Sequence, residues 1–64
     1  MTPEEAVQSI ENLRNETIKI LRVQKEDFLS FRQELIKQQD FKHFRGIAKH
    51  GGHVEYEYMK IPRS

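Results

Sequence analysis

The residues best suited to chemistry lie near the end of the chain, where all three histidines occur. His50 and His53 are separated by two glycines, and a tight turn there would let both imidazoles reach one metal ion. His43 comes seven residues before His50, about 23 Å away along an extended strand, which is too far for a third ligand. Two histidines without a nearby carboxylate or thiolate make a weak site. We therefore predict no metal site and no cofactor.

Two glutamates beyond the histidines are the other candidates for chemistry. Glu55 and Glu57 would lie about 7 Å apart on one face of a strand, a spacing that could suit paired carboxylates. Basic residues flank them, and the serines of the chain have no neighbours that would activate a nucleophile. A chain of 64 residues also leaves little room for a substrate pocket. We therefore predict that the protein is not an enzyme.

The composition describes a small, highly charged protein without cysteine. Eleven Lys and Arg against ten Asp and Glu give a net charge of +1. Because there is no cysteine, disulfides and thiolate metal sites are excluded. No apolar run approaches the roughly 20 residues of a membrane span, and the start MTPEE lacks a signal pattern. We expect one domain over residues 1–64, complete as written and cytoplasmic. So short a chain has a marginal core, which favours stabilisation by a partner chain.

Residues 3–39 have the pattern of one long amphipathic helix. Thr2 can serve as the N-cap, Pro3 suits the first helical position, and two glutamates follow in the first turn. No Gly or Pro occurs again before Gly46, and good helix formers dominate the stretch. Apolar residues recur every three or four positions. We assign this stripe to an oligomer interface made by Ile10, Leu13, Leu21, Phe28, Phe31 and Leu35.

A helical hairpin broken near residues 24–27 is the alternative. Asp27 would then cap a second helix, and a compact monomer could cover its own apolar face. An unbroken helix would instead extend beyond the reach of a short hairpin, and the large apolar patch left exposed would mark an interface. We expect the unbroken helix and a homo-oligomer, either a dimer or a tetramer, formed through it.

Residues 41–61 have the pattern of a β-hairpin that turns at Gly51 and Gly52. Both glycines accept positive φ, and the residues on either side are β-prone and alternate in kind. The fold class predicted from the two segments is α+β and mostly helical, with one long N-terminal helix followed by a C-terminal β-hairpin.

Two registers of this hairpin are open. A two-residue turn would set Ile47 opposite Tyr56, whereas a three-residue turn with a bulge would set Arg45 opposite Glu57 and bring Phe44 opposite Tyr58. The second register pairs opposite charges and places more apolar side chains together, so we prefer it.

The hairpin carries most of the basic and aromatic residues of the second half of the chain, and we assign six of them to partner binding: Arg45, Lys49, His50, His53, Tyr56 and Tyr58. We expect a small regulatory protein of bacterial or phage type that binds a larger protein, for example by adding a strand to its sheet. The alternative is a DNA- or RNA-binding regulator, because basic side chains can hold phosphates while aromatic ones stack on bases. The small net charge weighs against that alternative.

Overall fold

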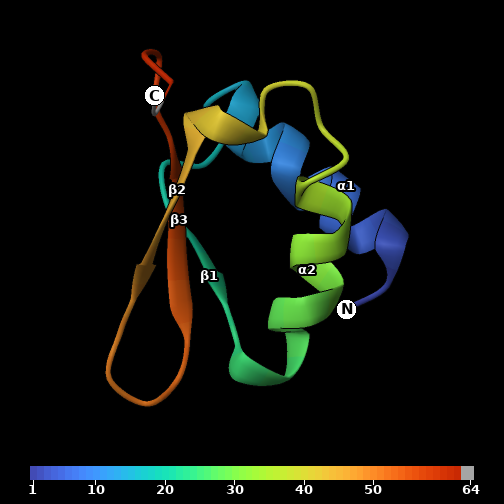
Figure 1. The fold of residues 1–64 in the computed structure, drawn as a ribbon, viewed down its shortest axis with the longest axis vertical. Coiled ribbons are helices and arrows are strands. Elements are labelled where there is room, and N and C mark those ends of the chain that lie inside the picture. Colours follow the sequence, from blue (N-terminus) through green and yellow to red (C-terminus); the bar gives the residue numbers. More distant parts are fainter. Residues whose placement is uncertain (63–64) are drawn as a thin grey trace.

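A computed structural model describes residues 1–62 as two helices and a three-stranded antiparallel sheet. Both helices lie on one face of the sheet, and its other face is uncovered (Figure 1). The α+β class is thereby confirmed, and the last two residues of the predicted domain lie outside the described range. In chain order the elements are α1 (Pro3–Arg14), β1 (Leu21–Val23), η1 (Lys25–Asp27), α2 (Phe28–Leu35), η2 (Phe41–His43), β2 (Phe44–Ala48) and β3 (Val54–Tyr58), where η marks a short 3-10 helix.

The helix α1 begins where the sequence predicts. The hydroxyl of Thr2 accepts a hydrogen bond from the Glu5 N–H at 3.1 Å, and the Glu5 carboxylate accepts one from the Thr2 N–H at 2.9 Å. This reciprocal capping box satisfies two amide groups that the first turn would otherwise leave unpaired. The buried residues of α1 follow at helical spacing and are Ala6, Ile10 and Leu13.

The long helix predicted over residues 3–39 is wrong, because α1 ends at Arg14. The Asn15 side chain accepts a hydrogen bond from the Thr17 backbone N–H at 3.0 Å, which forms a local turn in place of further helix. Glu16 then takes a left-handed φ of 63°. The β-branched residues after it favour extended structure, and the chain enters β1.

The alternative with a break near residues 24–27 comes closer to the structure. The second helix α2 begins at Phe28 with Asp27 at its N-cap position. The Asp27 side chain makes no capping bond there, because it accepts a hydrogen bond from the Met1 ammonium at 2.8 Å. Neither alternative predicted a strand between the helices. Within residues 1–62, no helix is long and apolar enough to cross a membrane.

The stripe assigned to an oligomer interface is part of the core of a single chain. Its members Ile10, Leu13, Phe31 and Leu35 are buried, while Leu21 and Phe28 are partly buried and pack against that core. The two short helices cover this stripe by folding against each other and the sheet. The long helical seam on which the predicted homo-oligomer depended is therefore absent from the described residues.

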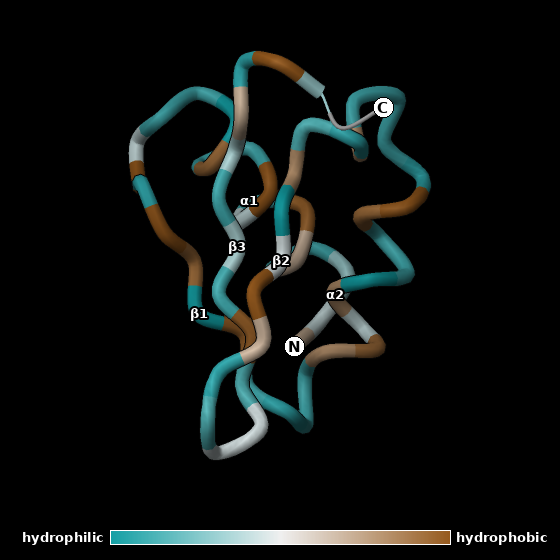
Figure 2. Tube along the Cα trace, turned by 60° about the vertical axis from the view of Figure 1, so that its left-hand side comes forward, coloured by the Kyte–Doolittle hydropathy of each residue, from teal (hydrophilic) through white to brown (hydrophobic). Residues whose placement is uncertain are grey.

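The sheet has the order β1-β3-β2, with β3 in the middle (Figure 2). In the hairpin, Arg45 lies opposite Glu57 and Phe44 opposite Tyr58, so the preferred register is confirmed. Residues 50–52 form its three-residue loop, in which Gly51 and Gly52 have φ of 91° and 88°. Only glycine adopts these backbone angles without steric cost. The strand β1 pairs with the other side of β3.

Candidate functional site

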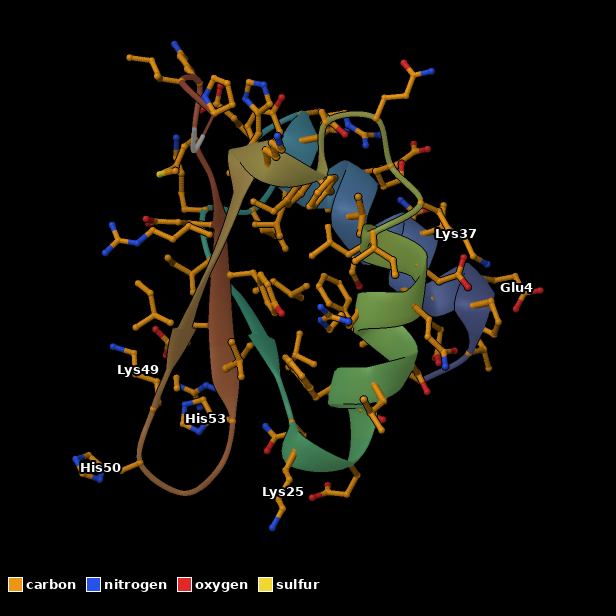
Figure 3. The ribbon with its side chains drawn as sticks, in the orientation of Figure 1. Glu4, Lys25, Lys37, Lys49, His50 and His53 are labelled. Atoms are coloured by element: carbon orange, nitrogen blue, oxygen red, sulfur yellow. The ribbon has the colours of Figure 1, made fainter. Side chains whose placement is uncertain are left out.

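The structure divides the residues predicted to bind a partner between the two faces of the sheet. Tyr56 faces the helices, is buried, and lies with its ring centroid 4.8 Å from that of Phe31. Tyr58 lies on the same face and packs against the core. His50 stands at the turn and points away from the sheet (Figure 3). The other three residues, Arg45, Lys49 and His53, lie on the uncovered face, so the six do not form one surface.

Ion pairs cross this uncovered face and involve both glutamates considered for catalysis. Arg22 and Lys49 approach the Glu55 carboxylate to 3.6 and 3.8 Å, and Arg45 approaches that of Glu57 to 3.7 Å. The His53 imidazole also lies 3.8 Å from the Glu55 carboxylate. Pairs this exposed contribute little to stability. In the part of the chain that the structure describes, no group of three His, Cys, Asp or Glu side chains is placed to hold a metal ion.

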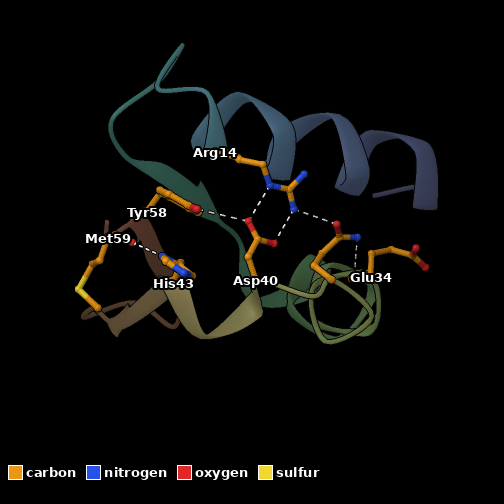
Figure 4. Close-up of polar contacts among 7 residues, drawn as sticks. Arg14, Glu34, Asp40, His43, Tyr58 and Met59 are labelled. Atoms are coloured by element: carbon orange, nitrogen blue, oxygen red, sulfur yellow. Dashed lines mark hydrogen bonds and ion pairs between the residues drawn. The ribbon is translucent and has the colours of Figure 1, made fainter. Parts of the chain in front are cut away.

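A polar cluster lies where α1 ends (Figure 4). The Arg14 guanidinium donates to both carboxylate oxygens of Asp40, each at 2.7 Å, and to the Gln38 side-chain oxygen at 2.9 Å. The Tyr58 hydroxyl donates to the same Asp40 carboxylate at 3.4 Å. The cluster therefore connects the end of α1, the segment that precedes β2, and the end of β3.

The contacts in this cluster shift the pKa values of its members. The hydrogen bond from Arg14 lowers the pKa of the Asp40 carboxyl, and the same bond raises the pKa of the Arg14 guanidinium. Partial burial and then the nearby Asp40 charge raise the pKa of Tyr58. The fold therefore favours a charged carboxylate beside a neutral phenol, an arrangement that stabilises structure.

Replacing Asp40 with Asn should lower the free energy of unfolding by about 1–2 kcal/mol at neutral pH, because the charge-assisted bonds from Arg14 are weakened. The native pKa of Asp40 lies below its unfolded value, so this stabilisation is complete above about pH 4. It is lost as the pH falls through the lower native pKa. Urea unfolding at neutral and acid pH measures both effects.

The exposed Glu26 provides a matched control for this prediction. Glu26→Gln removes one carboxylate without touching the cluster, and it should change the free energy of unfolding by less than about 0.5 kcal/mol. An Asp40→Asn variant that loses as much stability in acid as the native protein would contradict the role given to Asp40.

A groove lies between α2 and β2, on the helical side of the sheet. It encloses a hollow of about 270 Å³ lined by Arg32, Leu35, Ile36, Phe41, Phe44, Gly46 and Tyr56. Ile36 is 49 % exposed although it is a large apolar residue. Arg32 is exposed, and its guanidinium makes no hydrogen bond or ion pair with any residue of 1–62. The groove thus has apolar residues at its base, polar atoms over much of its accessible surface, and one available cation.

The edge of β2 forms the rim of this groove. The Met59 N–H donates to the His43 carbonyl and the Lys49 N–H donates to the His53 carbonyl. Because hydrogen-bonded and non-hydrogen-bonded pairs alternate in an antiparallel ladder, Gly46 and Ala48 turn their N–H and C=O groups away from β3. No strand among residues 1–62 pairs with β2 on that side. The edge is therefore open beside the groove.

Comparison with protein families finds one family whose model covers nearly all of this arrangement. The family model described as YkzS-like protein matches residues 3–57, a range that includes both helices, β1, β2 and nearly all of β3. The chain belongs to the YkzS-like family. It matches no curated protein and no solved structure. The family description states no activity or ligand, so the groove and the strand edge carry the functional argument for this member of the YkzS-like family.

Neither the groove with Arg32 nor the open edge of β2 was predicted from the sequence. Arg32 occupies a polar position in a stretch predicted to be helical, and nothing local distinguishes it from the other charged residues of that stretch. The available signal was the row Leu29, Arg32 and Ile36, which share one side of a helix. Leu29 is 70 % exposed. The exposure of Leu29, and the strand that lies across the groove from Arg32 and Ile36, become apparent only in the folded chain.

Proposed function

We propose that this YkzS-like protein is a non-enzymatic, cytoplasmic binding protein that attaches to a larger protein by strand addition at β2. The observation that carries the proposal is the open edge of β2 beside a groove with several apolar residues in its lining. In strand addition, backbone hydrogen bonds supply affinity, and pockets for alternate side chains supply specificity. The five residues of β2 provide outward-facing backbone groups for hydrogen bonds and border a groove that can receive a side chain.

The two edges of the sheet are not equivalent in this respect. The strand β1 has only three residues, and a very short edge strand is a common protection against pairing with other chains. β2 is longer, and Gly46 and Ala48 on it are both exposed and carry little or no side chain. A partner strand can therefore approach the backbone of β2 closely.

The charge distribution favours a protein partner over a nucleic acid. The cations of the uncovered face each stand near Glu55 or Glu57, so a phosphate backbone would meet carboxylates as well as cations there. Binding to nucleic acid relies on cations that are free to neutralise phosphates. A complex that forms in untreated extract, weakens with added salt and disappears after nuclease treatment, with no captured protein left, would support the alternative regulator and contradict strand addition.

Replacing Ala48 with Pro should abolish partner binding and leave the fold intact. Proline lacks the N–H that Ala48 turns outward, and it does not remove a bond to β3. The protein is used to capture partners from a nuclease-treated extract of its source cells. A captured protein is then purified and titrated against the native chain and the variant, and we expect its affinity to fall at least tenfold for Ala48→Pro.

The control is Ala48→Ser, which keeps the amide donor and a small side chain at the same position and should lose far less affinity than Ala48→Pro. A measurement without substitutions supports the comparison: on binding, the Gly46 and Ala48 amides should become protected from hydrogen exchange. Equal affinity for both variants, together with unprotected Gly46 and Ala48 amides, would contradict strand addition at β2.

A further inference from the structure

We propose that the groove between α2 and β2 selects an extended, internal protein segment. This segment has a bulky apolar residue and an Asp or Glu two positions apart, so that both side chains lie on the same face. This inference rests on the proposed function, because it identifies the kind of strand that β2 would accept. The apolar side chain would enter the hollow, and the carboxylate would pair with Arg32. The segment would add to the edge of β2 at Gly46 and Ala48.

The hollow lies at the small end of the size range of ligand sites and can admit a single side chain. Its volume is about 270 Å³, and sites for small molecules or cofactors occupy roughly 300–1,000 Å³. Leu35, Phe41 and Phe44 supply apolar walls, and Gly46 supplies no side chain on the strand side. A Leu or Phe side chain can enter such a hollow and remove part of its apolar surface from water.

The geometry of strand pairing places a partner side chain in this hollow. Side chains of an added strand that lie beside Gly46 and Ala48 project to the same face as theirs, which is the helical face. On that face every second residue of the segment points toward α2, with neighbours about 7 Å apart. One such residue can therefore enter the hollow while the next lies at its end.

Arg32 favours an acidic side chain at the next position of the bound segment that faces α2. The helix α2 and the strand β2 run in opposite directions (Figure 1), and Arg32 precedes Leu35 by about one helical turn. Arg32 therefore lies toward the Ala48 end of the groove, while the apolar walls lie toward Phe44. A carboxylate two residues along the bound segment would meet a guanidinium that has no ion pair with residues 1–62. Guanidinium and carboxylate groups form paired, charge-assisted hydrogen bonds.

A random peptide library displayed on phage provides the test, with the native chain as bait. We expect selected peptides to share a bulky apolar residue with Asp or Glu two positions away. Synthetic versions of these peptides, extended at both ends, should bind Arg32→Glu at least tenfold more weakly than the native chain. Selection on Arg32→Glu should replace the acidic residue with Lys or Arg.

The matched control is Lys25→Glu, which makes the same change of charge at an exposed side chain near the hairpin turn, outside the residues that line the groove (Figure 3). It should leave peptide binding within about twofold of the native value. Thermal unfolding checks that both variants fold, and replacing Asp or Glu by Asn or Gln in the peptide repeats the test without changing the protein. Loss of binding with that peptide supports the pairing with Arg32.

The remaining outcomes separate this inference from the proposed function. Peptides that lose affinity for Ala48→Pro but show no acidic preference would overturn the acidic specificity and leave strand addition standing. Peptides indifferent to Ala48→Pro, or a library that yields no specific peptide, would count against both. A dimer in sedimentation that Ala48→Pro dissociates would identify a second copy of this chain as the occupant and overturn the inference.

Discussion

Replacing Phe31 with Ala should lower the free energy of unfolding by about 3–5 kcal/mol and leave a large part of the protein unfolded at room temperature. The Phe31 side chain is completely buried and packs against Tyr56 with ring centroids 4.8 Å apart. A core of this size rarely supplies more than about 3–5 kcal/mol. The cavity left by one phenyl ring is therefore comparable to the whole stability. Urea unfolding followed by circular dichroism measures the loss.

Leu29→Ala on the same helix is the control for this experiment. Leu29 is 70 % exposed, so its truncation should change the free energy of unfolding by less than about 0.5 kcal/mol. The pair of variants also distinguishes the fold from a helical oligomer. A folded Phe31→Ala chain that dissociates from an oligomer into monomers would show that Phe31 belongs to an interface and not to the core of one chain.

The second large effect is expected at Gly46, where any side chain would collide with the core. A Cβ atom added to Gly46 would stand 2.9 Å from Cε1 of Tyr56, which lies opposite it in the hairpin. The Tyr56 ring cannot withdraw freely, because Phe31 packs against it. Gly46→Val should therefore lower the free energy of unfolding by about 1–3 kcal/mol, as overpacking usually does. Thermal and urea unfolding measure it.

Ala48→Val provides the comparison for Gly46→Val, since it adds a β-branched side chain to the same strand and the same face. Ala48 is exposed and lies opposite Val54, so this variant should be as stable as the native chain or slightly more stable. Equal destabilisation by the two substitutions would mean that β2 as a whole rejects larger residues. The register of the hairpin would then be in doubt.

Local patterns predicted the features that depend on neighbouring residues. The start of α1 depends on Thr2, Pro3 and Glu5, which interact within one turn, and the sequence alone identifies it. The hairpin depends on two adjacent glycines and on the pairing of residues close in the chain, so its existence and its register could both be inferred. These features needed no information from distant segments.

The errors arose where weak local preferences compete with contacts between distant residues. Residues 15–27 contain no Gly or Pro and many good helix formers, so propensity favoured a continuous helix. The Asn15 turn, and the pairing of Leu21 and Val23 with β3 more than 30 positions away, outweigh that preference. An apolar stripe at helical spacing is compatible with an interface or with a core, and only the path of the chain decides which.

Local sequence patterns were sufficient to predict the α+β class, the capped start of α1 and the register of the β2–β3 hairpin, because each follows from contacts between residues close in the chain. The end of α1, the strand at each edge of the sheet and the contacts among polar side chains depend instead on how distant segments pack. Arg14 is hydrogen-bonded to Asp40, which lies 26 positions later in the sequence, and Arg32 lies beside the open edge of β2. Such contacts between distant residues depend on how whole helices and strands pack, and no local sequence pattern encodes that packing.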